Sequence, residues 1–291
     1  MIALGAPTKQ RLLRMLWGWF RHQILISEKP LPRHRTTGLD DEQFTELARL
    51  VEQQLPEPSD KPTGRPHALR FLEALEVTCA YLRQNIVEEV LAEMYGVSPA
   101  TVSRAINDLT DLVGAALDVF IPNAEEAAAA IRGRVCLLDG SLAPCWSWAS
   151  RQDLYSGKHK TTGHNFQVIS DLDGNLLAVS DPVPGKCHDM AAVKATAFDV
   201  LLAPAGDVIA DKGYQGSGYV TPVKKPQNDE LLVREHEFNK WVSGLRAAVE
   251  RSVANLKTWR ILHTDYRPSI GTYRSSSNAA IGLYFFELSF A

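Results

Sequence analysis

The chain has 291 residues, of which 45% are hydrophobic and 22% charged, and its formal net charge is −3. This balance is typical of a globular protein with a buried core and excludes a largely disordered chain. The four cysteines form no CxxC pair and have no nearby paired histidines, so neither a zinc motif nor a disulfide framework is indicated. A reducing, cytoplasmic environment is expected.

Residues 1–65 are predicted to form a basic arm with helical segments, followed by a linker. The apolar stretch "LLRMLWGWFRHQILI" contains Arg14 and Arg21, which predicts an amphipathic helix and excludes a signal peptide or membrane span. Residues 1–38 carry seven basic side chains and one acidic one, so a basic face exists despite the acidic total. The Pro-rich segment 55–66 predicts the linker. The arm either contacts DNA or packs on the rest of the protein.

Two helices joined by a short turn are predicted within residues 66–127. The first stops at Gly96, Ser98 caps the second, and Pro99 occupies its first position, where a missing N–H leaves no hydrogen bond unmade. The apolar residues that recur at helical spacing are Val87, Val90, Leu91 and Met94 in the first helix, and Val102, Ile106 and Leu109 in the second.

This pattern predicts an all-α helix-turn-helix DNA-binding domain. Its second helix would present Thr101, Ser103, Arg104 and Asn107 to a DNA groove. A plain helical hairpin with no role in DNA binding fits the same pattern.

Residues 128–291 are predicted to form an α/β domain. Strands are expected in "RVCLLDGS", "HNFQVISD", "NLLAVSDP" and "DVIADKGY", and a fifth in "GYVTPVKKP". One helix is expected in "CHDMAAVKATAFDVLL", and a long one around "RAAVERSVANLK". The order β-β-β-α-β-α is that of an RNase H-like core with a mixed five-stranded sheet. In this arrangement the first and fourth strands lie side by side and a late helix packs across them.

Three carboxylates are expected to converge in this domain. Asp139 is predicted at the end of the first strand, Asp211 at the end of the fourth, and Glu250 on the late helix. Phosphodiester chemistry with two divalent ions needs such a group of hard oxygen ligands. Taken singly, either Asp is also typical of a turn, and the Glu of a solvated helix face.

Basic residues flank Glu250 on the predicted helix. Arg246 lies four residues before it and Lys257 seven residues after it. At about 100° per residue these offsets leave all three side chains within about 40° of one line along the helix. One helix face therefore presents cation, anion and cation, a pattern that suits metal ions and DNA phosphates together.

The order of these motifs resembles that of the DDE transposases of the insertion sequence five group, which are related to Harbinger-type endonucleases. The matching stretches are "LLDGS", "YSGKHKTTGHNFQVISDLDGNLLAVSDPVPGKCHD", "IADKGY" and "RAAVERSVANLK", with the helix-turn-helix upstream. The resemblance implies an RNase H-like core, two Mg²⁺ or Mn²⁺ ions, hydrolysis at transposon ends, and transfer of the resulting 3′-OH to target DNA.

The resemblance also implies roles for particular residues. Asp139, Asp211 and Glu250 match the catalytic, metal-binding triad of the family. Arg246 and Lys257 match basic partners of the family's Glu, which are expected near DNA-end phosphates.

Other candidates lie between the first two acidic motifs. Lys158 and Lys160 belong to a basic loop that either contacts phosphates or is simply solvated. His188 and Asp189 match a His-Asp pair of the family, and we expect them to support the site. The alternative for Asp189 is an ordinary first-turn carboxylate that complements a helix dipole.

The expected function is that of a cut-and-paste DNA transposase. Its helix-turn-helix and basic arm would bind terminal inverted repeats, and pairing of two ends implies a homodimer or higher oligomer on double-stranded DNA. No membrane association is expected, and the location would be the bacterial cytoplasm at the nucleoid. Two alternatives are a domesticated, catalytically silent DNA-binding protein and a metal-dependent endonuclease without strand transfer.

Overall fold

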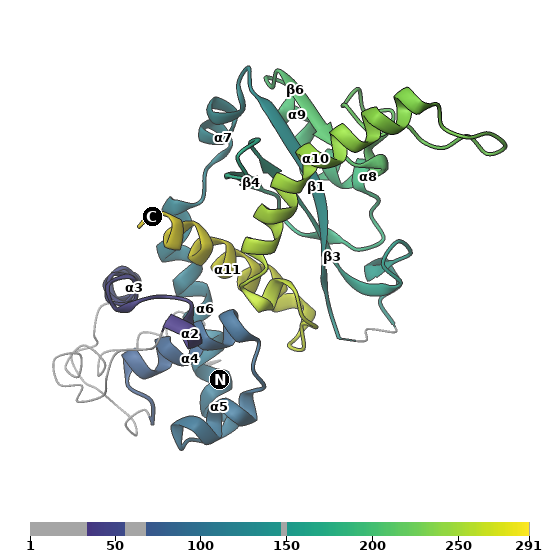
Figure 1. Cartoon of the computed structure of the whole chain (residues 1–291). Coiled ribbons are helices and arrows are strands. Elements are labelled where there is room, and N and C mark those ends of the chain that lie inside the picture. Colours follow the sequence, from purple (N-terminus) through teal and green to yellow (C-terminus); the bar gives the residue numbers. More distant parts are fainter. Residues whose placement is uncertain (1–33, 56–67, 147–149, 291) are drawn as a thin grey trace, which may run out of the picture. The chain divides into compact units, whose positions relative to one another are not determined.

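The computed structural model describes residues 34–55, 68–146 and 150–290 (Figure 1). The chain divides into two compact units. The helical unit comprises residues 1–120 and 278–291, and the sheet unit comprises residues 121–277. Most of the predicted arm and linker therefore lies outside the described residues.

The sequence-based boundaries 1–65, 66–127 and 128–291 differ from this division at the C-terminus. The last helix, α11 (Tyr273–Leu288), begins in the sheet unit, but its residues from Asn278 onward group with the helical unit. The catalytic domain had been expected to include the whole C-terminus.

The described residues of the helical unit form helices joined by short turns. A capping box starts α3: the Asp40 carboxylate accepts from the Gln43 backbone N–H at 2.8 Å, and the Gln43 side chain accepts from the Asp40 backbone N–H at 3.0 Å. The elements are α2 (His34–Thr37), α3 (Asp41–Gln54), α4 (Phe71–Gln84), α5 (Glu88–Tyr95), α6 (Pro99–Leu117), η2 (Asp118–Phe120) and the later part of α11.

Local signals define the turn between α5 and α6 as the sequence predicts. Gly96 ends α5 in the left-handed region, with φ of +64°. The Ser98 hydroxyl accepts from the Thr101 backbone N–H, and Pro99 opens α6. The predicted apolar stripe of α6, which consists of Val102, Ile106 and Leu109, is buried.

The apolar stripe predicted for α5 is confirmed only at Leu91, which is buried. Val87, Val90 and Met94 are exposed, Met94 to 62%, and the second buried position of this helix is Ala92. Val87 lies outside the helix as its N-terminal cap, and α5 packs through the narrow face that Leu91 and Ala92 form.

The sheet unit contains a mixed sheet of six strands. Its main path runs β2-β3-β1-β6, and β4 and β5 also pair with β3. β1 is antiparallel to β3 and parallel to β6, so the predicted first and fourth strands are indeed neighbours. The strands are β1 (Val135–Pro144), β2 (Tyr155–Ser156), β3 (Thr161–Ser170), β4 (Leu176–Val179), β5 (Val183–Pro184) and β6 (Asp207–Ala210).

The predicted count of five strands is wrong in two respects. β2 and β5, each of two residues, were not predicted, and the fifth strand expected in residues 218–226 does not form. There Val220 makes a single isolated bridge to Ile209. Pro222 and Pro226 lack the backbone N–H that a longer ladder needs.

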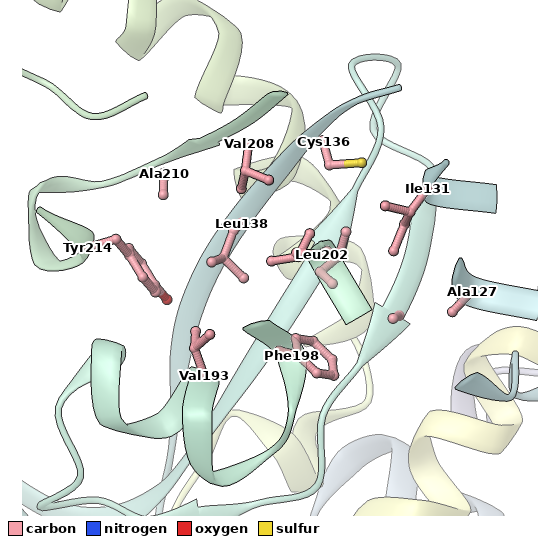
Figure 2. Close-up of a cluster of buried hydrophobic side chains, with 12 residues drawn as sticks. Ala127, Ile131, Cys136, Leu138, Val193, Phe198, Leu202, Val208, Ala210 and Tyr214 are labelled. Atoms are coloured by element: carbon pink, nitrogen blue, oxygen red, sulfur yellow. The ribbon is translucent and has the colours of Figure 1, made fainter. Parts of the chain in front are cut away.

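Helices cover both faces of this sheet (Figure 1). Side chains of α7, α8 and α9 form one apolar core with alternate residues of β1, β3, β4 and β6, and Figure 2 shows Tyr214 in it beside Leu138 and Ala210. The long helix α10 crosses the sheet on the other face. The helical elements are α7 (Ala124–Ile131), η3 (Gln152–Leu154), α8 (Asp189–Ala195), α9 (Phe198–Leu202), η4 (Lys212–Tyr214), α10 (Val233–Leu256), η5 (Arg260–Leu262) and η6 (Ile270–Thr272).

The single helix predicted between the third and fourth strands is two short helices. α8 ends at Ala195, and Ala197 adopts the left-handed conformation with φ of +56° before α9 starts. The Thr196 hydroxyl donates to the Ala192 carbonyl at 2.8 Å within the last turn of α8. The break lets α8 and α9 pack on the sheet as separate pieces.

Candidate active site

The first two predicted carboxylates lie side by side. The parallel pairing of β1 with β6 ends at Leu138 and Ala210, and Asp139 and Asp211 are the next residue of each strand. Asp139 was expected to end its strand, but β1 continues to Pro144 because it stays paired with β3 after β6 has ended. The turn interpretation of its Asp-Gly pair is therefore wrong.

Asp211 combines two roles. Its Oδ1 accepts from the Gly213 backbone N–H at 2.6 Å, so it does cap the turn η4, as the turn interpretation predicts. Its Oδ2 lies 3.6 Å from Nζ of Lys158, whose Nζ is also 2.8 Å from Oδ2 of Asp189. Lys158 thus bridges two carboxylates.

The helix α10 brings Arg246 and Glu250 to Asp139. Nη2 of Arg246 lies 3.2 Å from Oδ1 of Asp139, and its Nη1 lies 3.8 Å from Oε1 of Glu250. The Glu250 side chain is 59% exposed, against 18% for Asp139. The Ser252 hydroxyl fixes the helix on the sheet by donating to the Gly174 carbonyl at 2.7 Å. Arg246 therefore stands between an inner and an outer carboxylate.

The negative charges of Asp139 and Asp211 repel each other at these strand ends. Burial raises the pKa of Asp139, the Arg246 guanidinium opposes this, and the Asp211 carboxylate raises the pKa further. Burial lowers the pKa of Lys158, but its hydrogen bond to Asp189 and the nearby carboxylates outweigh this, so its pKa is raised and it stays cationic. A bound cation would relieve the repulsion between the two Asp carboxylates.

Lys257 lies just past the end of the predicted helix face. α10 ends at Leu256, and Lys257 is its C-terminal cap. Burial lowers the pKa of Lys257, and the charge of Asp139 opposes that shift. The structure thus places Lys257 within electrostatic range of Asp139, as it does Arg246.

The remaining predicted residues differ in exposure. Lys160 is exposed, in a turn with φ of +53°, and pairs with none of the described acidic side chains in an ion pair. His188 is the exposed cap of α8 and makes no capping hydrogen bond with its side chain, whereas Asp189 is buried.

On α6 of the helical unit, the predicted DNA-reading side chains are exposed or half-buried. Arg104 donates to the Ala100 carbonyl at 2.9 Å and so lies along its own helix. The four residues are Thr101, Ser103, Arg104 and Asn107.

Three residues that the sequence analysis missed form a buried chain of hydrogen bonds behind the site. The Tyr214 hydroxyl donates to Oε1 of Gln167, Nε2 of Gln167 donates to Oδ1 of Asn165 at 3.3 Å, and Nδ2 of Asn165 donates to Oδ1 of Asp189 at 3.4 Å. The available signal was the pair Asn165 and Gln167, two residues apart in an apolar strand and so on one face. Buried amides require partners.

The donor chemistry of the site fits divalent cations. Asp139, Asp211 and Glu250 supply hard oxygen ligands of the kind that Mg²⁺ and Mn²⁺ prefer. In the described ranges, however, no three His, Cys, Asp or Glu side chains form a cluster with metal-binding spacing. The exposed Glu250 pairs with Arg246. Convergence of all three carboxylates stays a prediction.

The mixed sheet, its covering helices and the acidic strand ends are consistent with a DDE nuclease fold. The family model described as "DDE superfamily endonuclease" matches residues 138–284, and the chain belongs to this family. Enzymes of this superfamily generally use divalent metal ions.

The chain is similar to transposases of bacterial insertion sequences. One, from Streptomyces albus G, is described as a transposase for insertion sequence element IS112; it is 28% identical over 228 residues, which cover 78% of this chain and 83% of the relative. Another, from Microchaete diplosiphon, is described as a transposase for IS702; it is 24% identical over 263 residues, or 87% of this chain and 93% of the relative. No solved structure matches the chain significantly.

No helix within the described ranges combines the length and the apolar character needed to cross a membrane.

Proposed function

We propose that the protein is a DNA transposase that cleaves DNA at the ends of an insertion sequence and transfers the 3′-OH ends to target DNA. The observation that carries the proposal is the neighbouring position of Asp139 and Asp211 at the end of the β1–β6 pairing, with Arg246 of α10 placed between Asp139 and Glu250. The similarity to the two insertion-sequence transposases supports the same activity. Membership of the insertion sequence five group stays a prediction.

The acidic residues would hold the metal ions. Asp139 and Asp211 would bind two Mg²⁺ or Mn²⁺ ions and Glu250 would complete the site. Such ions, when bound, activate the attacking oxygen and stabilise the leaving one. Arg246 pairs with Asp139, and Lys257 lies within electrostatic range of it. Both would hold a phosphate of the DNA end, because guanidinium and ammonium groups are the usual phosphate partners.

The helices α5 and α6 would act as the helix-turn-helix that binds the terminal repeats. The Gly96 turn and the Ser98 cap support this proposal, as does the exposure of Arg104 and Asn107 on α6. The catalytic core would be RNase H-like. The protein would act as a homodimer or larger oligomer, because two DNA ends must be paired. Its place of action would then be the bacterial nucleoid.

The test is Mg²⁺-dependent cleavage of a DNA duplex that carries the terminal repeat of the element. Glu250→Gln removes the charge with little change in shape, and Glu237→Gln is the matched control, because Glu237 is an exposed Glu earlier on the same helix. We expect the wild type and Glu237→Gln to cleave, and Glu250→Gln to bind the duplex without cleaving it.

The outcomes separate the candidate functions. Equal cleavage by Glu250→Gln would remove Glu250 from the catalytic site. Binding without cleavage by the wild type would favour the catalytically silent DNA-binding protein. Cleavage without joining of ends to an added target plasmid would favour the endonuclease without strand transfer.

A further inference from the structure

The buried chain of Tyr214, Gln167, Asn165 and Asp189 has one possible direction. A carboxylate only accepts hydrogen bonds, so Asn165 must turn its Nδ2 toward Asp189 and its Oδ1 toward Gln167. Gln167 must then turn its Nε2 toward Asn165 and its Oε1 toward Tyr214, whose hydroxyl donates. The charge of Asp189 thus fixes the orientation of two amides and a phenol.

This chain lies against the backbone beside both strand-end carboxylates. A Cβ atom at Gly140 would meet Oδ1 of Asp189 at 2.8 Å, the Tyr214 hydroxyl at 3.0 Å and Nε2 of Gln167 at 3.2 Å. A Cβ atom at Gly213 would meet Oδ2 of Asp189 at 2.5 Å. Gly140 follows Asp139 directly, and Gly213 follows Asp211 by two residues. Asp189 therefore packs where a side chain on either backbone would exclude it.

The two ends of the chain are anchored differently. Tyr214 is fully buried in the core of the sheet unit, as Figure 2 shows, and lies three residues after Asp211. Burial raises the pKa of its phenol, so the hydroxyl stays protonated and able to donate. At the other end, Asp189 holds Nζ of Lys158, the residue that also faces Asp211.

We propose that Asp189, Asn165, Gln167 and Tyr214 are positioning residues: they fix the spacing of Asp139 and Asp211 and the place of Lys158 between Asp189 and Asp211. The inference rests on the proposed function, because it assigns the chain to the metal-binding carboxylates. Asn165, Gln167 and Tyr214 do not need to touch DNA or metal. They act through the backbone at Gly140 and Gly213 and through Asp189 itself.

The test measures Mn²⁺ binding to the whole protein by electron paramagnetic resonance of free Mn²⁺, together with thermal unfolding. Tyr214→Phe removes one hydroxyl from the chain. Tyr266→Phe is the matched control, because the Tyr266 hydroxyl is likewise buried and hydrogen-bonded, to Thr272 at 2.6 Å and Ser276 at 3.1 Å, away from the site. Asp139→Asn removes a proposed metal ligand, so the difference between its Mn²⁺ binding and that of the wild type is the binding at the site.

We expect Tyr214→Phe to raise the half-saturating Mn²⁺ concentration about tenfold or more, as loss of a group that supports metal ligands commonly does. Tyr266→Phe should lower the melting temperature but leave Mn²⁺ binding unchanged. If Tyr214→Phe does not fold, Gln167→Met keeps the side-chain length, removes the central link and gives the same test.

The inference and the proposed function fail in distinguishable ways. Suppose that the wild type binds Mn²⁺ at the site and that Tyr214→Phe and Gln167→Met bind it equally well. This result would overturn the inference alone, because a purely structural role changes only the melting temperature. Equal Mn²⁺ binding by the wild type and Asp139→Asn would overturn the proposed metal site, and this inference with it.

Discussion

The two faces of the sheet differ sharply where they meet the candidate active site. On the α10 face, Asp139, Arg246 and Glu250 form a row of charges in which Glu250 is the most exposed. On the α8 face, Asp189 and its amide partners are buried and joined by hydrogen bonds. Groups that must reach a ligand need access, whereas a buried, fully paired network gives rigidity. On the proposed function, residues of the α10 face would carry out the chemistry and residues of the α8 face would position them.

The largest effect is expected on the α10 face, from Asp139→Asn. Loss of a residue that supports a metal ligand lowers activity by up to about a hundredfold. Asp139→Asn removes a proposed ligand itself, so cleavage should fall by more than that. DNA affinity should stay close to that of the wild type, because the proposed DNA-reading side chains lie on α6. Single-turnover cleavage and a binding titration on the same duplex would measure both. Asp139→Asn cleaving at the wild-type rate would break the assignment of chemistry to this face.

A smaller effect is expected between the faces, from Gly140→Ala. The new methyl group would meet Asp189, Tyr214 and Gln167 at or below contact distance, so unfolding free energy should fall by about 1–3 kcal/mol, as overpacked sites do. Gly244→Ala on α10 is the control: a Cβ there meets nothing within 4 Å, and Ala favours a helix by roughly 1 kcal/mol. Denaturant melts would compare the two. Equal stability of both variants would mean that the faces are not closely packed at Gly140.

The smallest effect is expected from Lys158→Met, at the residue that joins the two faces. If its ammonium contacts a DNA phosphate, the slope of log affinity against log salt should decrease by about one. Lys194→Met, an exposed lysine at the end of α8, should leave the slope unchanged. Fluorescence anisotropy over a range of salt concentrations would decide. An unchanged slope for Lys158→Met would leave Lys158 with its role between Asp189 and Asp211 alone.

Features with local causes could be predicted from the sequence. The start of α6 follows from Ser98 and Pro99, whose effects act within one turn. The ion pair of Arg246 and Glu250 follows from their spacing of four on a helix. The neighbouring position of the strands that carry Asp139 and Asp211 was predicted from the order of the elements alone.

Features that depend on tertiary pairing could not. Asp139 lies inside β1 because β3 pairs beyond the point where β6 stops, and a single strand's sequence does not state where its partners end. The chain from Tyr214 to Asp189 joins residues of η4, β3 and α8, so no local pattern defines it. The exposure of Met94 likewise depends on what packs against α5.

The mixed pairing of β1 also has a consequence for how the protein folds. Its antiparallel partner β3 follows soon after it in the chain, whereas its parallel partner β6 comes much later, beyond α8 and α9. Closing the longer loop costs more chain entropy, so we expect the β1–β3 hairpin to form first and β6 to dock afterwards. Asp139 and Asp211 become neighbours at that later step. A nascent chain that has not yet made β6 therefore has no neighbouring pair of Asp139 and Asp211, and the proposed metal-binding site would form only once the sheet is complete.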